Sequence, residues 1–312
     1  MRLAAFSRCR CVAVIWLAGF WVFLAHGGQG MGPTIRVEGE GWGQVEKAEI
    51  QAVLESVAEQ LITRPSPRLA GTIVVTHGSG SPVTLYEKGA QGTYQVRLSA
   101  SDRRWAQYAY QFGHELCHVM SNFEVHSTLA SNNQWFEEAL CEAAGLHALR
   151  GMAVTWKNAP PYPAWADYAQ AFRDYATHLA REPHRKLPGD TGMATWLQQN
   201  LDELRGNPYR REKNEVVAMQ LLPLFESDAG NWASLYALNR NPAVSSMSFP
   251  DYLRCWHRDA QGASRDFVGK IMTLLAISTP SAPGPANTPG PMISARPATE
   301  VQAYPGGQQA TN

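Results

Sequence analysis

The sequence predicts an α+β fold, in which a small mixed sheet with one prominent helix is followed by a mainly helical region. Two observations indicate this order. Short apolar runs bounded by glycine, serine and proline, which are typical of strands, are confined to the part of the chain before residue 100. Beyond Gly151 the apolar residues recur instead at spacings of three and four, which is the period of an amphipathic helix.

In the first region, residues 45–62 are predicted to form a helix because their apolar residues fall on one face. Strands are predicted at residues 34–38, 71–76, 83–86 and 93–98. A run of glycine, serine and proline at residues 78–82 makes the turn between two of them. The next helix begins near Ser101 or Asp102, either of which can cap its first turn.

The second region is predicted to consist of helices joined by short loops. Segments with helical spacing are residues 164–180, 193–204, 212–225, 232–238, 248–257 and 266–277. The tryptophans of this region are expected to form core or cleft walls rather than to take part in chemistry. They are Trp156, Trp165, Trp196, Trp232 and Trp256.

The helix after residue 102 carries the most informative pattern, His114-Glu115-Leu116-Cys117-His118. Two histidines four residues apart lie about one turn apart on the same helical face, so both imidazoles can reach one metal ion. The carboxylate of Glu115 can take a proton from water activated by that metal. A surface helix with two unconnected histidines is the alternative. An apolar stripe on the same helix favours the metal site, because it anchors the helix to a core. The stripe is Trp105, Tyr108, Phe112, Leu116 and Val119.

A catalytic zinc ion usually takes a third protein ligand, and a second predicted helix over residues 133–142 offers carboxylates for it. Glu138 shares a face with Trp135 and Glu142, whereas Glu137 is turned about 100° away. A carboxylate on the face of Glu138 can complete a His2Glu site. The other interpretation is that the acidic pair is the solvated start of a helix, which fits Glu137 better than Glu138.

The H-E-x-x-H pattern followed by Trp135-Phe136-Glu137-Glu138-Ala139 resembles the gluzincin clan of zinc metallopeptidases, which includes thermolysin-like and aminopeptidase N-like enzymes. The resemblance implies one Zn²⁺ per chain, with His114 and His118 as two of its ligands and Glu115 as the general base. It also implies a zincin-like two-lobed domain with the cleft between its lobes. In that clan an edge strand binds extended substrate by main-chain pairing, and residues 93–98 are expected to be that edge.

The third ligand follows from the same resemblance. Alignment on the Trp-Phe-x-Glu text places it at Glu138, whereas the spacing of eighteen residues that is common in the aminopeptidase branch places it at Glu137. We predict Glu138. Glu142, one turn later, is expected to orient a histidine ligand, with an ordinary exposed helix glutamate as the alternative.

Two related patterns are missing. The metzincin extension requires glycine and histidine where this chain has Ser121 and Glu124, so that class is excluded. The G-x-M-x-N strand of the aminopeptidase branch has no counterpart in Gly89-Ala90-Gln91-Gly92-Thr93. An endopeptidase is therefore expected rather than an aminopeptidase.

The ends of the chain differ from its middle. Residues 1–27 combine three arginines, a short apolar run and small residues, which predicts a secretory signal, with an uncleaved membrane anchor as the alternative. Residues 28–278 are predicted to be the zincin-like domain, and residues 279–312 a disordered tail rich in proline, glycine, alanine and threonine. The expected location is periplasmic or secreted, or tethered to a membrane by the first segment.

The net charge limits the classes of partner that can be expected, and the cysteine content limits the possible disulfides. Removal of residues 1–27 takes three arginines and no acid, which leaves 27 − 3 = 24 basic against 27 acidic residues and gives no reason to expect nucleic acid or anionic membrane as partners. The remaining cysteines are Cys117, Cys141 and Cys255. Because two helices that share a metal must approach, either a Cys117–Cys141 disulfide or two buried thiols is expected.

These features predict an exported zinc peptidase that acts on peptide or protein substrates. A non-catalytic zincin-fold protein that binds a cell-envelope partner, or a zinc hydrolase of a non-peptide bond, are the alternatives. A tyrosine or histidine of the helical region is expected to stabilise the oxyanion. The sequence does not choose among Tyr162, Tyr168, Tyr175, His147, His178, His184 and Tyr209, and it leaves the oligomeric state open.

Overall fold

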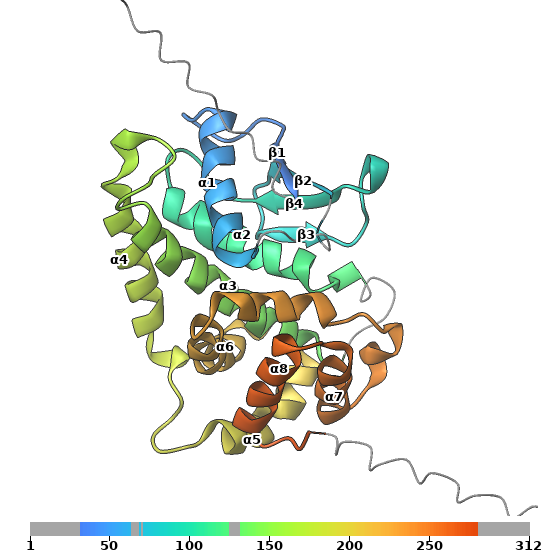
Figure 1. Cartoon of the computed structure of the whole chain (residues 1–312). Coiled ribbons are helices and arrows are strands. Elements are labelled where there is room, and N and C mark those ends of the chain that lie inside the picture. Colours follow the sequence, from blue (N-terminus) through green and yellow to red (C-terminus); the bar gives the residue numbers. More distant parts are fainter. Residues whose placement is uncertain (1–31, 64–68, 70, 125–131, 280–312) are drawn as a thin grey trace, which may run out of the picture.

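The computed structural model describes residues 32–63, 69, 71–124 and 132–279 (Figure 1). Within them the chain is α+β, with a small mixed sheet near the start and helices from residue 105 onward, as the sequence predicts. The predicted signal segment, residues 1–27, and the predicted tail beyond residue 279 lie outside the described residues. Among the helices of the described ranges, none combines the length and the apolar character that crossing a membrane requires.

The sheet has four strands in the order β1-β2-β4-β3. These are β1 (Thr34–Val37), β2 (Thr72–His77), β4 (Tyr94–Leu98) and β3 (Val83–Leu85). β1 and β4 both run parallel to β2, and β3 runs antiparallel to β4. Val75 of β2 is in register with Val96 of β4, and both are buried. Helices α1 (Lys47–Leu61) and α2 (Trp105–Met120) pack against the sheet and against each other (Figure 1).

The expectation that residues 93–98 form the edge of the sheet is wrong, because β4 lies between β2 and β3. The reason is apolar content. Val96 and Leu98 are buried, whereas β3 has an exposed Val83 and buries only the polar Thr84. The more apolar strand takes the interior position, and the edge beside α2 is β3. Thr84 marks this contact, because its hydroxyl lies 3.1 Å from the carbonyl oxygen of Glu115.

Helix α3 (Gln134–Thr155) crosses α2 at very short range. The helix runs unbroken through Gly145 and continues ten residues past it. A Cβ atom at Gly145 would lie 2.9 Å from the carbonyl oxygen of Tyr110, and one at Gly113 would lie 3.1 Å from the Cα of Gly145. The two glycines therefore allow the backbones of α2 and α3 to approach at the level of the first motif histidine.

The remaining helices cover the side of α3 that faces away from the sheet (Figure 1). The α-helices are α4 (Tyr168–Arg181), α5 (Met193–Gly206), α6 (Arg211–Glu226), α7 (Phe249–Asp259) and α8 (Ala263–Leu274). The 3-10 helices of this region are η4 (Pro163–Trp165), η5 (Pro183–Arg185), η6 (Ala229–Ala237) and η7 (Pro242–Ser246). The segment predicted at residues 232–238 is thus 3-10 rather than α-helical, and the segment predicted to begin at residue 164 begins as η4.

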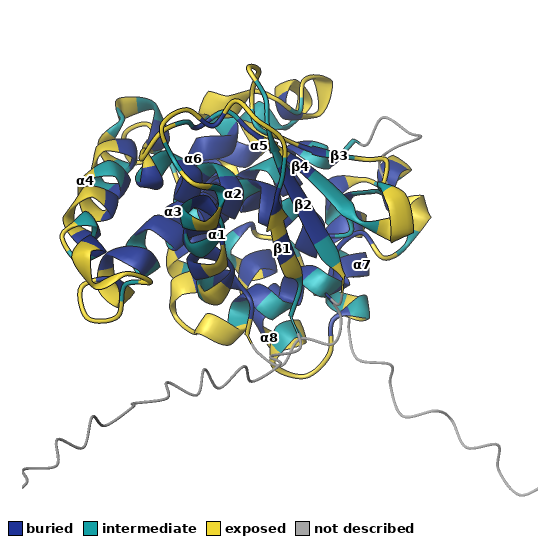
Figure 2. Cartoon of the chain, turned by 90° about the horizontal axis from the view of Figure 1, so that it is seen from above, coloured by how far each residue is buried: buried dark blue, intermediate teal, exposed yellow. Residues whose placement is uncertain are grey.

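Burial is concentrated where α2, α3 and α6 meet, and exposed residues lie on the outer turns (Figure 2). The five tryptophans predicted as core or cleft walls are all buried, and Trp156 and Trp232 are almost completely so. The motif helix α2 itself packs against α1 and the sheet on one side and against α3 on the other.

Candidate metal centre

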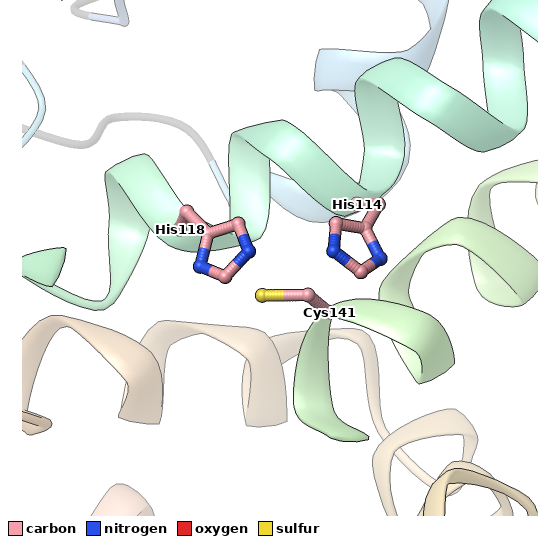
Figure 3. A group of neighbouring side chains, drawn as sticks. All are labelled: His114, His118 and Cys141. Carbon is pink, nitrogen blue, oxygen red and sulfur yellow. The ribbon is translucent and has the colours of Figure 1, made fainter. Parts of the chain in front are cut away.

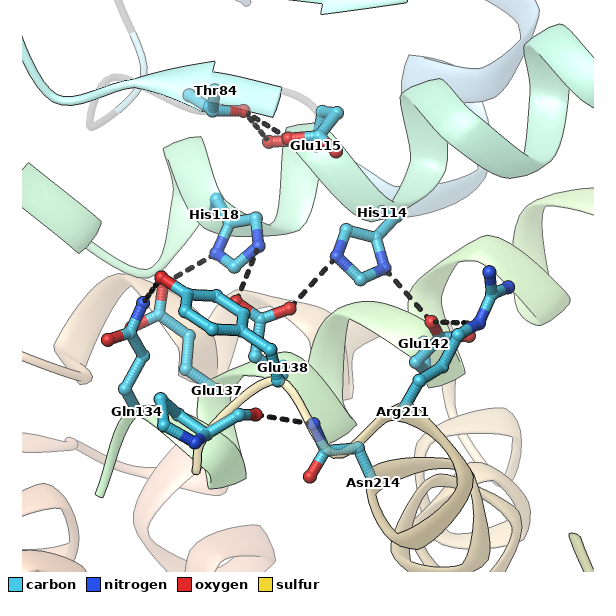
Figure 4. Close-up of polar contacts among 12 residues, drawn as sticks. Thr84, His114, Glu115, His118, Gln134, Glu137, Glu138, Glu142, Arg211 and Asn214 are labelled. Atoms are coloured by element: carbon cyan, nitrogen blue, oxygen red, sulfur yellow. Dashed lines mark hydrogen bonds and ion pairs between the residues drawn. The ribbon is translucent and has the colours of Figure 1, made fainter. Parts of the chain in front are cut away.

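The H-E-x-x-H residues lie in the second half of α2, and the two histidines point to the same side (Figure 4). The ring centroids of His114 and His118 are 5.1 Å apart. Helical geometry alone accounts for this, because residues four apart lie one above the other on one face. The expected convergence of the two imidazoles is present.

Glu138 of α3 faces both histidines with one carboxylate (Figure 4). Its Oε2 lies 3.4 Å from Nε2 of His114, and its Oε1 lies 3.7 Å from Nε2 of His118. The structure thus brings together the three residues that the sequence assigns to a metal. All three present the atoms that zinc prefers, two imidazole nitrogens and a carboxylate oxygen.

Glu137 has a different place from the one expected. The interpretation as a solvated helix start is wrong, because the residue is 1% exposed. Its Oε1 lies 2.8 Å from Nδ1 of His118 and accepts a hydrogen bond of 2.8 Å from the hydroxyl of Ser121. Its Oε2 accepts a hydrogen bond of 2.7 Å from the amide of Asn239, which in turn accepts one from Tyr252. A carboxylate at Nδ1 favours the proton there and leaves Nε2 free to bind a metal.

Glu142 stands behind His114, as expected from the sequence, and is not an exposed helix glutamate. Its Oε1 lies 3.7 Å from Nδ1 of His114 and 3.5 Å from Nε of Arg211 (Figure 4). Its Oε2 accepts a hydrogen bond from the hydroxyl of Tyr110. The carboxylate is buried and is held by Tyr110 and Arg211, and it faces Nδ1 of His114 at a distance beyond that of a hydrogen bond.

The electrostatics of the cluster favour positive charge. Burial opposes protonation of His114, but the Glu138 hydrogen bond and nearby carboxylates outweigh it and raise its pKa to about 9. For His118 burial is likewise outweighed, by the charge of Glu138 and the hydrogen bond to Glu137, and its pKa also rises to about 9. Without a metal the histidines hold protons among these acids, and a cation at the Nε2 atoms would displace them.

Glu115 points away from the histidine pair toward the edge strand (Figure 4). Its Oε2 accepts a hydrogen bond of 2.7 Å from the hydroxyl of Thr84 in β3. The residue is 3% exposed, yet it lines the same cavity as both histidines. Thr84 could not be singled out from the sequence, because β3 and α2 become neighbours only in the folded chain.

The cysteines near the site are free thiols. Of the two expectations for Cys117 and Cys141, the structure has two buried thiols and no disulfide between them. Cys141 lies beside the histidines (Figure 3), and its sulfur and one nitrogen of each ring are within 4.8 Å of one another. Burial raises the pKa of the Cys141 thiol, with the Cys117 thiol and the Glu137 and Glu138 carboxylates adding to the effect, so the metal-binding thiolate is disfavoured.

The histidines and Glu138 line a cavity of about 620 Å³. It is bounded by β3 and the residues before it, by α2, by the start of α3 and by the start of α6. Of the seven residues that the sequence offers for the oxyanion, Tyr175 and Tyr209 belong to the described lining and the other five do not. Tyr86 and Phe123, which the sequence did not single out, line it as well.

A second group of acids and histidine, Glu182, His184 and Glu215, also brings its ligand atoms within 4.8 Å of one another. Its carboxylates are already paired. Glu182 lies 2.9 Å from Nε of Arg185, and Oε1 of Glu215 lies 2.6 Å from Arg185 and 2.8 Å from Arg211. Two guanidinium groups would repel a cation, so this group is an ion-pair network.

No family model, curated protein or solved structure matches the chain. The function is therefore inferred from the residues of the site and their geometry.

Proposed function

We propose that this protein is a zinc-dependent peptidase with a zincin-like arrangement of two lobes, β1–β4 with α1 and α2 on one side of the cleft and the later helices on the other. One observation carries the proposal. Nε2 of each motif histidine faces one oxygen of the same Glu138 carboxylate, at 3.4 and 3.7 Å. Two imidazoles and a carboxylate from a second helix are the donor set of a catalytic zinc site that keeps one position open.

The residues present fit a zinc ion. His114, His118 and Glu138 would hold it, while Glu137 and Glu142 would fix the two rings through their Nδ1 atoms. Bound zinc supplies a Lewis acid that polarises a carbonyl group and makes water acidic near neutral pH.

Glu115 moves the proton in this proposal. The Thr84 hydroxyl holds one oxygen of its carboxylate, and the other oxygen can accept a proton from the attacking water and pass it to the leaving amine. Tyr209 is proposed as the donor to the oxyanion, because it lines the cavity and its hydroxyl accepts a hydrogen bond from Gln134, with the hydroxyl of Tyr86 as a second partner. The edge strand β3 offers main-chain groups for an extended peptide.

The substrate is proposed to be a peptide cleaved away from its amino terminus, since the strand that holds a free amino group in aminopeptidases has no counterpart in this sequence. Export of the protein remains part of the proposal and depends on residues 1–27.

The first test is the zinc content of the purified chain by plasma mass spectrometry, in parallel with three variants. We expect about one zinc per chain in the parent, in Glu137→Gln and in Cys141→Ala, and loss of zinc in Glu138→Gln. Loss in Cys141→Ala with retention in Glu138→Gln would reassign the third ligand to the thiol. A folded parent that takes up no zinc would refute the proposal.

The second test is cleavage of a peptide library by the zinc-loaded parent and by Glu115→Gln. Loss of cleavage in the variant with zinc retained is the expected result. Equal cleavage by both would exclude Glu115 as the base. Peptides bound but never cleaved by the parent would favour a binding protein instead.

A further inference from the structure

The cavity has two chemically different ends, one on each side of the histidine pair. Beyond His118 its lining contains an aromatic pair, since the ring of Phe123 lies 6.2 Å from that of His118 and is stacked with Tyr86 at 5.4 Å, with the polar Gln134 beside Tyr86. Beyond His114 its lining is polar, and the residues there are Gln107, Tyr110, Tyr175 and Arg211. A substrate in this cavity therefore meets apolar groups on one side of the histidines and hydrogen-bond donors on the other.

Arg211, the first residue of α6, is the single lysine or arginine among the described lining residues. Its Nε lies 2.8 Å from Oε1 of Glu215 and 3.5 Å from Oε1 of Glu142, and its Nη2 lies 3.4 Å from the hydroxyl of Tyr110. Its Nη1 has no hydrogen-bond partner in the part of the chain that the structure describes, and its side chain is 62% exposed. The guanidinium is fixed along one edge and presents unused donors on another.

The neighbouring carboxylates do not remove the ability of Arg211 to bind an anion. Glu142 and Glu215 are each paired with Arg185 as well as with Arg211, and Glu182 is paired with Arg185, so three carboxylates share two guanidinium groups. Arg185 is completely buried and is not among the described lining residues, which leaves Arg211 as the one guanidinium that a ligand can reach. Of these three carboxylates only Glu142 is among the described lining residues, so the wall at this end presents one acid and one guanidinium group to a ligand.

Two further donors stand at the same end. Tyr175 and Gln107 line the cavity, and the ring of Tyr175 lies 6.0 Å from that of Tyr110. Among the described residues, the side chains of Tyr175 and Gln107 make no hydrogen bond. Burial raises the pKa of Tyr175, so its hydroxyl stays protonated and able to donate. A carboxylate can accept about four hydrogen bonds, and Arg211, Tyr175 and Gln107 together can supply them.

We propose that this end of the cavity binds a carboxylate of the substrate, with Arg211 as its principal donor. The proposal rests on the peptidase function and narrows its substrate class to peptides with a free carboxyl terminus or an acidic side chain near the bond that is cleaved. Arginine suits this task because its planar fork of donors matches the two oxygens of a carboxylate.

The position of Arg211 limits where that carboxylate lies. One carboxylate, that of Glu142, separates Nε of Arg211 from Nδ1 of His114, at 3.5 and 3.7 Å (Figure 4). An extended peptide advances about 3.3 Å per residue. The bound carboxylate is therefore within about three residues of the bond that faces the histidines.

The test measures binding by calorimetry to the zinc-loaded Glu115→Gln chain, which holds substrate without turnover. Three pentapeptides of otherwise identical sequence serve as probes: one with a free carboxyl terminus, its carboxamide, and a carboxamide with glutamate as its fourth residue. We expect the free acid or the glutamate peptide to bind about 10–100-fold more tightly than the plain carboxamide, the magnitude of a charge-assisted hydrogen bond. Which of the two binds identifies the source of the carboxylate.

Adding Arg211→Gln separates recognition from a structural role. This change should abolish the preference and leave the affinity for the plain carboxamide within about twofold. Arg210→Gln, at a neighbouring exposed arginine paired with Glu203, is the matched control and should keep the preference. If Arg211 acts only by holding Glu142, the variant will weaken all three peptides equally, and the proposal fails. Equal binding of all three peptides before the change refutes it as well.

The same experiment distinguishes this proposal from the peptidase proposal. Preferential carboxylate binding without cleavage by the zinc-loaded parent would refute the peptidase function and leave the anion site standing. Cleavage of all three peptides with equal KM would support the peptidase function and refute the carboxylate site.

Discussion

At the scale of the residue, adjacent carboxylates take different tasks because a helix turns about 100° per residue. Glu138 faces the Nε2 atoms of both histidines, whereas Glu137 reaches Nδ1 of His118 and is held there by Ser121 and Asn239. The two acids thus approach the same imidazole from opposite nitrogens. In the proposed site, Glu138 would bind the metal and Glu137 would set which nitrogen of His118 carries the proton.

Tyr209 allows a prediction at this scale. Tyr209 lines the cavity, and its hydroxyl accepts a hydrogen bond from Gln134 and has the hydroxyl of Tyr86 as a second partner. Tyr209→Phe is expected to lower kcat about a hundredfold with little change in KM, because the lost hydrogen bond forms mainly in the transition state. Steady-state kinetics on a cleaved library peptide would measure it. Tyr162→Phe, which alters an exposed ring packed on Trp165, is the control and should leave both constants unchanged. An unaltered kcat in the Tyr209 variant would remove it from the mechanism.

The residues that could be identified from sequence are those whose spacing is local. His114, Glu115 and His118 follow from one helical turn, and Glu138 from the aromatic pair just before it. The role of Glu137 could not be read in this way, because Asn239 comes to it from about a hundred residues further along the chain.

At the scale of the element, the crossing of α2 and α3 determines whether the histidines and Glu138 can meet. Gly145→Ala would place a methyl group 2.9 Å from the Tyr110 carbonyl oxygen and from its ring, and backbone atoms cannot yield cheaply. We expect this change to lower the free energy of unfolding by about 1–3 kcal/mol and to weaken zinc binding, because the helices must separate. Urea unfolding and zinc titration would measure the two effects.

The matched control is Gly206→Ala at the end of α5, where an added Cβ meets nothing within 4 Å. Its stability should be unchanged or slightly higher. If both alanine variants behave alike, the close crossing is not what sets the helix separation.

A second element-scale prediction concerns the contact between α3 and α6. Glu226 lies 2.8 Å from Nη1 of Arg150 and 3.7 Å from Nδ1 of His147. Burial opposes ionisation of Glu226, but His147 and Arg150 outweigh it and lower its pKa below 4.5. A lowered folded-state pKa stabilises the protein above about pH 4.5, and this contribution is lost as the pH falls through the lowered value.

Glu226→Gln should therefore be less stable than the parent at pH 7, by at most about 1 kcal/mol because the pair is partly exposed. The difference should shrink as the pH falls below about 4.5 and the Glu226 carboxylate becomes protonated. Glu55→Gln, on the exposed side of α1, should show no such pH-dependent difference. Urea titrations of the parent and the variant at pH 7 and pH 3.5 would measure this difference in the free energy of unfolding. An equal loss of stability at both pH values would mean that the charge of Glu226 is not its cause.

Helices and strands could be predicted from sequence where the spacing of apolar residues within the segment itself determines the structure. The four strands and α1, α2, α5 and α6 occupy nearly the predicted residues. The order of the strands was not predictable in this way, because the insertion of β4 between β2 and β3 depends on which strand buries more apolar surface against α1 and α2. That error placed the expected substrate edge on β4 instead of β3.

At the scale of the whole molecule, the candidate centre joins segments that are distant in the chain. α2 supplies two donors and α3 the third, while the backing of Glu137 comes from Asn239 and that of Glu142 from Arg211. An ion bound by the three donors would therefore stabilise the packing between the sheet side and the helical side together. A ligand that binds only the folded state adds RT ln(1 + [L]/Kd) to the free energy of unfolding.

Zinc at about a hundred times its Kd should accordingly add about 2.7 kcal/mol and raise Tm by roughly 5–10 °C for a chain of this size. The measurement is thermal unfolding followed by circular dichroism, with zinc and after removal of metal by a chelator. Glu138→Gln should unfold at the same temperature in both conditions, whereas Glu137→Gln should keep part of the shift, because it retains all three donors. If the parent binds zinc but its Tm does not change, the ion is bound away from the α2–α3 contact. Only a site that spans the two helices would couple zinc binding to unfolding of the whole chain.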